Sequence, residues 1–166
     1  MITPPTAPDG LWYWEDINPG DTMDLGTSTM TRDELLAFGR TYDPQPHHVD
    51  EEAAAHSMFG KLFSSGWHSC CILMRQYVDV MLNKSASLGA GGVEEVRFMK
   101  PVFIGDELMG KATCKAKRAL NSKPDVGTMH MVLELWNSRG EQVLAWEAHQ
   151  FMRRRHPGAP VAGERA

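Results

Sequence analysis

The sequence predicts an α+β fold in which an antiparallel sheet wraps around one long, apolar helix. Apolar residues follow a helical period up to residue 82, and they alternate with polar residues from Gly91 onward. Helices gathered in one part of a chain and strands in another are typical of this class. A chain of 166 residues can build one such core. We expect a single domain over 12–153, an irregular arm at 1–11 and a flexible tail at 154–166.

The first elements are expected to be a strand and a short helix. Residues 22–29 follow an Asn-Pro-Gly-Asp turn signal and are predicted to form the strand. Thr31 and Glu34 have the spacing of a capping box, in which the threonine caps a helix and the glutamate reaches back to its amide. We expect Gly39 and Pro44 to end this helix, because neither residue continues a helix readily.

Two further helices are predicted before the strands. A short one is expected to start at Asp50 and to stop at Gly60, since acidic residues favour a helix start and glycine favours a helix end. Ser64 or Ser65 is expected to cap the main helix, residues 66–82. Its apolar residues recur every three or four positions and its other face is also fairly apolar, so it should be buried on more than one side.

Four strands are predicted in the second half of the chain. In one of them, small apolar residues alternate with Lys111, Lys115 and Lys117, which we expect on a solvated face together with Arg118. Residues 121–127 are expected to form a loop. The predicted strands cover residues 93–99, 108–117, 129–135 and 143–152.

Composition and charge exclude several classes of function. The formal net charge is −4 and the pI is about 6.0, without a basic stripe, so nucleic acid is not an expected partner. The three cysteines, Cys70, Cys71 and Cys114, do not form a disulfide pattern and fit a reducing compartment. No apolar run is long enough for a membrane span, and the N-terminus lacks the features of a signal peptide. We therefore expect a soluble, cytoplasmic protein.

Residues 40–68 hold the strongest candidate for a functional site. Asp43 and His48 lie close together in a segment that also contains Pro44 and Pro46. Proline fixes φ and removes a backbone donor, so we expect neither a regular helix nor an internal strand here. A rigid loop that holds a carboxylate beside an imidazole has the groups that general acid–base catalysis requires.

Three segments of the chain carry a resemblance to a known family. They are YDPQPHHVDEEAA, SGWHS at the start of the main helix, and EVRFMKPVFIGDEL. Together, over residues 12–153, the chain resembles the MaoC-like dehydratases, which are hot-dog-fold relatives of the (R)-specific enoyl-CoA hydratases. The resemblance implies a homodimer or a dimer of dimers. It also implies reversible hydration of trans-2-enoyl thioesters, carried by coenzyme A or acyl-carrier protein, with no metal and no other cofactor.

The resemblance also assigns roles to individual residues. Asp43 and His48 match the catalytic pair, and Pro46 matches the proline between them. Gly66 matches the glycine whose backbone N–H polarises the thioester carbonyl, a role suited to a helix N-terminus. Cys71 stands where the hydratases are expected to carry a serine. We expect His48 to activate water and Asp43 to act as the acid, although the sequence leaves this order open.

Pro46, Cys71 and five further residues are expected to contribute to substrate binding. Ser65, Trp67 and His68 surround the helix start, although Trp67 also suits the core and His68 could face either the acyl pocket or the sheet. Arg97 and Lys100 could meet the phosphates of coenzyme A. Cys71 is expected to be a small buried packing residue rather than a nucleophile. The histidines between residues 47 and 68 lack zinc-like spacing on one helical face, so no metal site is expected there.

Two rival functions remain open at this point. A hot-dog thioesterase usually needs a carboxylate near the central helix, and Asp79, late in that helix, is the only acidic residue in it. A non-catalytic acyl-CoA-binding subunit would keep the fold without the chemistry. Thiol release would indicate the thioesterase, loss of the enoyl absorbance would indicate the hydratase, and a pure binder would show neither.

Overall fold

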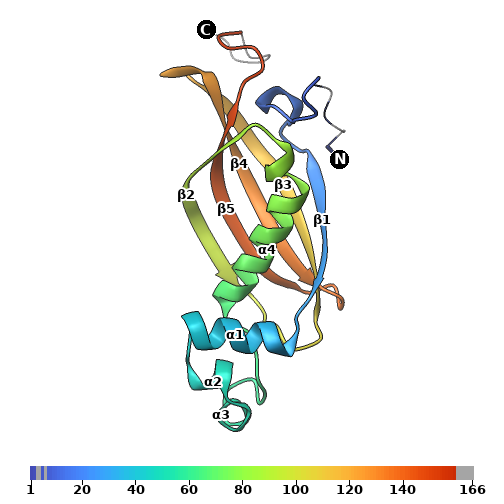
Figure 1. Cartoon of the computed structure of the whole chain (residues 1–166), viewed down its shortest axis with the longest axis vertical. Coiled ribbons are helices and arrows are strands. Elements are labelled where there is room, and N and C mark those ends of the chain that lie inside the picture. The colour runs from blue at the N-terminus through green and yellow to red at the C-terminus, as the bar shows by residue number, and fades with distance from the viewer. Residues whose placement is uncertain (3–4, 6, 160–166) are drawn as a thin grey trace.

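The fold is an antiparallel sheet of five strands that curls around one long helix, as Figure 1 shows for a computed structural model that describes residues 1–2, 5 and 7–159. The strand order is β1-β3-β4-β5-β2. This confirms the predicted class. The strands are β1 (Thr22–Thr29), β2 (Ser87–Phe98), β3 (Glu107–Leu120), β4 (Lys123–Asn137) and β5 (Gln142–Arg153). The helices are α1 (Arg32–Tyr42), α2 (Pro46–Val49), α3 (Glu51–Ala55) and α4 (Gly66–Val80), with 3-10 turns at Trp14–Asp16 and Leu82–Lys84.

The core lies between α4 and the concave face of the sheet. Leu73 and Tyr77 of α4 are buried against alternate residues of β4, which are its inward-facing set: Met129, Met131, Leu133 and Leu135. The predicted burial of α4 on more than one side is wrong for the single chain, because Trp67 and Met74 are 60% and 41% exposed. One face of the helix therefore has no cover within the described chain. No helix among the described residues is long and apolar enough to cross a membrane.

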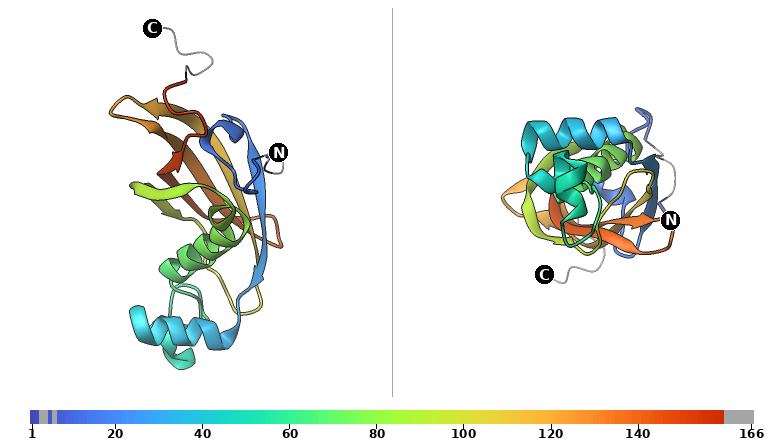
Figure 2. Two further views of the ribbon diagram at one scale, coloured as in Figure 1. Left: turned by 45° about the horizontal axis from the view of Figure 1, so that its top comes forward. Right: turned by 90° about the horizontal axis from the view of Figure 1, so that it is seen from below.

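Helices α1, α2 and α3 gather at the N-terminal end of α4 (Figure 2). Thr31 caps α1 as predicted, accepting a hydrogen bond from the amide of Glu34. Gly39 does not end the helix, which continues to Tyr42. Gly39 instead allows α1 to approach α2, since a Cβ there would lie 2.9 Å from the carbonyl oxygen of His48.

Two local predictions need correction. Pro46 and His48 lie in a single helical turn, α2, because proline is tolerated at the first helical position, where its missing N–H has no helical partner. Most of the predicted loop 121–127 belongs to a long hairpin, in which β4 begins at Lys123. Strand pairing continues to Leu120 and Lys123, so contacts between strands override the local turn signals there.

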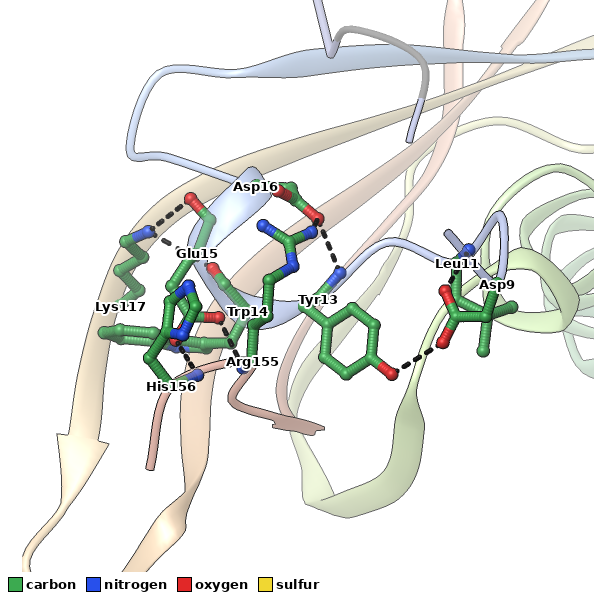
Figure 3. A network of polar contacts seen from close by, with 9 residues as sticks. All are labelled: Asp9, Leu11, Tyr13, Trp14, Glu15, Asp16, Lys117, Arg155 and His156. Carbon is green, nitrogen blue, oxygen red and sulfur yellow. Dashed lines mark hydrogen bonds and ion pairs between the residues drawn. The ribbon is translucent and has the colours of Figure 1, made fainter. Parts of the chain in front are cut away.

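The N-terminal 3-10 turn and the start of the C-terminal tail hold each other (Figure 3). Arg155 pairs with Asp16 at 2.6 Å, and Glu15 accepts hydrogen bonds from the backbone amides of Arg155 and His156. Lys117 is half-buried rather than solvated, because its ammonium donates to the carbonyl of Trp14 and lies over that ring. The first residues of the predicted tail are thus packed, and its end lies outside the described residues.

Candidate active site

Asp43 and His48 lie side by side, although they come from different elements. Asp43 is the C-cap of α1, and its amide donates to the carbonyl of Gly39 at 2.9 Å. His48 is in α2 and is 5% exposed. The His48 Nε2 atom lies 3.4 Å from Asp43 Oδ2. The short turn through the prolines therefore brings an acid and an imidazole together, with the carboxylate nearer to solvent.

The backbone fixes which nitrogen of His48 carries a proton. His48 Nδ1 lies 2.9 Å from the carbonyl oxygen of Phe63. A carbonyl only accepts hydrogen bonds, so Nδ1 carries the hydrogen in the neutral ring. Nε2, which faces Asp43, then keeps its lone pair. A water molecule near Asp43 could give a proton to this nitrogen.

The environment of Asp43 favours its ionised form. Burial alone would raise its pKa, but hydrogen bonds from Ser65 and Gln45 and the proximity of the two histidines outweigh burial, and the pKa is lowered. Gln45 Nε2 donates to Asp43 Oδ1 at 2.8 Å. Asp43 is therefore a carboxylate at neutral pH, and the acid role expected for it would require that it first gain a proton.

Replacing Gln45 by alanine is expected to raise the pKa of Asp43, because one of the hydrogen bonds that lower it is lost. A folded-state pKa below the unfolded value of about 3.9 means that ionised Asp43 stabilises the fold at neutral pH. That contribution disappears as the pH falls through the folded-state pKa, and it is smaller in Gln45→Ala. Titration of the Asp43 carboxyl carbon by NMR measures the shift.

The matched control is Gln142→Ala, which removes the same type of bond, from Gln142 Nε2 to Glu134 Oε1, on the sheet. This variant should leave the pKa of Asp43 unchanged. An Asp43 pKa that does not move in Gln45→Ala would refute the account of its ionisation.

Gly66 begins α4 directly beside the pair. Ser65 is the N-cap, and its hydroxyl accepts from the amide of Trp67 at 3.3 Å. The Gly66 N–H has no hydrogen-bond acceptor within the described part of the chain. A Cβ at this position would lie 2.7 Å from the Phe98 ring, so a larger residue would require that ring to move. An unpaired N–H at the positive end of a helix is a suitable donor to a developing oxyanion.

A second tight turn builds the opposite wall of the site. Asp106 Oδ2 accepts from the amide of Phe103 at 2.9 Å, and Arg139 donates to Asp106 Oδ1 at 3.0 Å. The amide of Ser64 donates to the carbonyl of Val102 at 2.8 Å, which ties the entrance of α4 to this turn. The Pro-Val-x-x-Gly-Asp segment therefore positions the wall, while its aspartate is held by an arginine.

All three predicted catalytic residues line one pocket. It has a volume of about 760 Å³ and opens to Asp43, His48 and Gly66. Phe59 and Phe63 are among its apolar walls, and its other lining residues include Lys100, Phe98, Val102, Arg139 and Glu141. A pocket of this size, in which apolar walls surround a set of polar and charged side chains, has the character of a small-molecule site.

The predicted substrate-binding residues divide into two groups. Ser65, Trp67 and Lys100 line the pocket, whereas Pro46, His68, Cys71 and Arg97 do not. The ring of His68 is buried and stacks on Phe38 with centroids 4.6 Å apart, so it packs against α1. Arg97 pairs with Glu95 at 2.7 Å. Cys71 is exposed rather than buried, because it shares the uncovered face of α4.

Ser69 is one of the pocket residues that the sequence did not single out. It is 4% exposed, lies in the first turn of α4 and lines the pocket beside Gly66. Residues three apart share a face of a helix, so Ser69 follows Gly66 on the pocket side, whereas Cys71 does not. That spacing was the available signal, and it identifies Ser69 as a serine near the pair.

The comparisons with known proteins agree with this geometry. The MaoC like domain family matches residues 16–134. Protein MaoC of Klebsiella aerogenes is 31% identical over 106 residues, which are 63% of this chain and 31% of that protein. The (R)-specific enoyl-CoA hydratase of Rhodospirillum rubrum is 27% identical over 106 residues, which are 62% of this chain and 69% of that protein. The chain thus spans less than a third of the length of protein MaoC.

A solved structure extends the similarity to nearly the whole fold. The crystal structure of a MaoC-like dehydratase from Rhodospirillum rubrum has a TM-score of 0.81 and 36% sequence identity. The match covers 87% of this chain and 99% of that chain. The chain thus shares its overall fold with that dehydratase over most of its length.

Proposed function

The chain belongs to the MaoC like domain family, and from this premise we propose that it hydrates trans-2-enoyl thioesters reversibly to 3-hydroxyacyl thioesters. The observation that supports this most is the meeting of three groups in one pocket: the Asp43 carboxylate, the Nε2 atom of His48 and the free N–H of Gly66. Adding water to an enoyl thioester requires a base, a proton for the α-carbon and a donor to the carbonyl oxygen.

The reaction proceeds by proton transfer at His48 and charge stabilisation at Gly66. A water molecule held by the Asp43 carboxylate gives one proton to His48 Nε2 while its oxygen bonds to C3. The electrons of the C2–C3 double bond move toward the thioester oxygen, which accepts a hydrogen bond from Gly66 N–H. The imidazolium then returns the proton to C2, directly or through Asp43. The net change is the addition of one water molecule, so this step requires no redox cofactor.

The pocket also accounts for recognition of the thioester carrier. Lys100 stands in the lining, exposed and without an ion-pair partner among the described residues, where it could meet a phosphate. Arg139 forms ion pairs with both Asp106 and Glu141. We therefore assign it to holding the rim of the pocket together rather than to binding a phosphate of the ligand. We propose coenzyme A or acyl-carrier protein as the carrier, since both present a phosphate next to the pantetheine arm.

We also propose that a second copy of the chain covers the exposed face of α4 and β2. Trp67 and Met74 on α4 and Val93 and Phe98 on β2 are all exposed apolar residues, and β2 is an edge strand of the sheet. Exposed apolar patches and unpaired strand edges promote association. Met74→Lys should therefore shift the protein from dimer or tetramer toward monomer in sedimentation velocity.

The matched control for this variant is Met109→Lys, because Met109 is 39% exposed but lies on β3. It should leave the oligomeric state unchanged. A wild-type protein that sediments as a monomer, or equal effects of the two substitutions, would contradict the proposed interface.

The proposed function is tested with crotonyl-CoA and longer enoyl-CoA esters, by following the ultraviolet absorbance of the conjugated enoyl group. Hydration should remove the absorbance without releasing thiol. Thiol release would favour the thioesterase, for which Asp79 is unsuitable because it is exposed and paired with Arg75 at 2.6 Å. Binding of the esters with neither signal would favour the non-catalytic subunit and overturn the proposal.

A further inference from the structure

Four ionisable side chains meet on the outer face of the sheet, opposite α4. They are His130 of β4, Glu147 and His149 of β5, and Glu94 of β2. The alternate residues of β4 point to the core, so His130 points outward. His130 and His149 are directly opposite each other in the β4–β5 register, and their ring centroids are 4.8 Å apart. We call these four residues the outer-face cluster.

Each imidazole of the outer-face cluster is already held by a carboxylate. His130 Nε2 lies 2.7 Å from Glu147 Oε2, and His149 Nε2 lies 2.8 Å from Glu94 Oε1. One ligand atom from each of Glu94, His130 and His149 can be chosen so that all three lie within 4.8 Å of one another. Three converging donors of these types are the first requirement of a metal site.

A break in the strand register places Glu94 in the cluster. Val93 is paired with Ala148 and Glu95 with Glu147, so β2 has one more residue than β5 at Glu94. Such a bulge turns a side chain away from the regular alternation. Here it brings the Glu94 carboxylate to His149, on the same face of the sheet.

We propose that Glu94, His130 and His149 form a binding site for a divalent transition-metal ion such as Zn²⁺. Imidazole nitrogen and carboxylate oxygen are ligands that Zn²⁺ takes, and three protein ligands leave one position for water. Tetrahedral bonds of about 2.1 Å require ligand atoms about 3.4 Å apart. The half-exposed side chains of Glu94 and His149 can rotate to reach that spacing.

Glu147 has a supporting role in this site. Its hydrogen bond to His130 Nε2 leaves Nδ1 of the same ring for the metal. A carboxylate that holds the second nitrogen of a ligating histidine fixes the ring and makes it a stronger ligand. Glu147 also lies 4.0 Å from Lys115, which balances its charge.

The charges around the cluster determine which ions it should prefer. Arg118 lines the same shallow hollow as the two histidines, and Lys115 lies 4.0 Å from Glu147. These two cations offset the charges of Glu94 and Glu147, so a hard cation gains little from the local field. Bonds to imidazole nitrogen must then supply the affinity, which favours Zn²⁺, Co²⁺, Ni²⁺ and Cu²⁺ over Mg²⁺ and Ca²⁺.

The experiment uses the full chain without an affinity tag, stripped of metal with a chelator. Zn²⁺ is titrated by calorimetry, and Co²⁺ by its visible absorption, which reports nitrogen ligands in a tetrahedral site. We expect one ion per chain, at least tenfold weaker binding in Glu94→Gln, and loss of the Co²⁺ spectrum in His130→Gln and His149→Gln. Zn²⁺ should also raise the thermal midpoint of the wild type but not of His149→Gln.

The control variants are His47→Gln and His156→Gln, which should bind Zn²⁺ as the wild type does. Circular dichroism of the metal-free variants excludes misfolding as a cause of lost binding. The proposal is overturned if Zn²⁺ at about 100 µM gives no saturable binding. It is equally overturned if binding survives His130→Gln and His149→Gln, or if Mg²⁺ binds as tightly as Zn²⁺.

Discussion

Asp43→Asn and His48→Gln are each expected to lower kcat for enoyl-thioester hydration by about 10²- to 10⁴-fold, the range that a positioned acid or base contributes. Asparagine keeps the size of Asp43 but cannot hold water as an ionised acceptor. Glutamine at position 48 can still meet the carbonyl of Phe63 but has no basic nitrogen. Initial rates of absorbance loss with saturating enoyl-CoA measure both effects.

The control for these two variants is His47→Gln. His47 stacks on Phe63 with centroids 5.0 Å apart, and it adjoins His48 in the chain without lining the pocket. Its replacement should leave kcat within a few-fold of the wild type. An Asp43→Asn or His48→Gln variant that keeps more than a tenth of wild-type kcat would remove the pair from the mechanism.

The pair should also behave as a unit. One water molecule is held by both groups. The double variant Asp43→Asn/His48→Gln is therefore expected to lose about as much activity as whichever single variant is less active. Independent losses that multiply in the double variant would indicate that the two residues act in separate steps.

The second large effect is expected from removing the backbone donor at Gly66. Proline suits the first position of α4, and Ser65, with φ −54° and ψ 140°, already has the conformation that a residue before proline adopts. A larger residue at position 66 meets the Phe98 ring, so the comparison is made in a Phe98→Ala background. Gly66→Pro should then lower kcat by about 10²- to 10³-fold relative to Gly66→Ala, as expected for one oxyanion donor.

The alanine variant is the matched control, because it adds a Cβ at the same place but keeps the N–H. Thermal unfolding of both double variants shows whether α4 still begins at this residue. Equal kcat in the proline and alanine variants would show that the Gly66 amide does not stabilise the transition state.

The fold could be predicted from the sequence because its signals are local and periodic. The strand at Thr22–Thr29 matches the prediction at both ends, and Thr31 and Ser65 cap helices as expected from their positions. Asp43, His48 and Gly66 were predicted to belong together from the spacing of a family motif, and in the structure they line one pocket. In each case a few neighbouring residues carry the information.

The remaining errors concern contacts between distant segments. The sequence does not show that Lys117 lies over Trp14 or that His68 packs against Phe38. The outer-face cluster is of the same kind. It depends on the β4–β5 register and on a bulge in β2, neither of which follows from alternating polarity, and residues 130 and 149 are far apart in the chain.

The exposed face of α4 illustrates a different reason for error. The apolar residues Trp67 and Met74 suggest burial, and the periodicity of the helix cannot tell whether the cover comes from the same chain or from another. The structure of one chain leaves them exposed. The sequence pattern thus correctly indicated an apolar surface on this face of α4. We propose that a second copy of the chain buries that surface.

The reaction itself is tested most directly by the mass of the product formed from trans-2-enoyl-CoA esters of several chain lengths in D₂O. We predict a 3-hydroxyacyl-CoA that has gained one molecule of water and carries one deuterium bound to C2, formed by the wild type and not by Asp43→Asn. Free coenzyme A as the product would indicate hydrolysis instead. Unchanged esters of every length, despite measurable binding, would contradict the assignment of hydratase activity to this pocket.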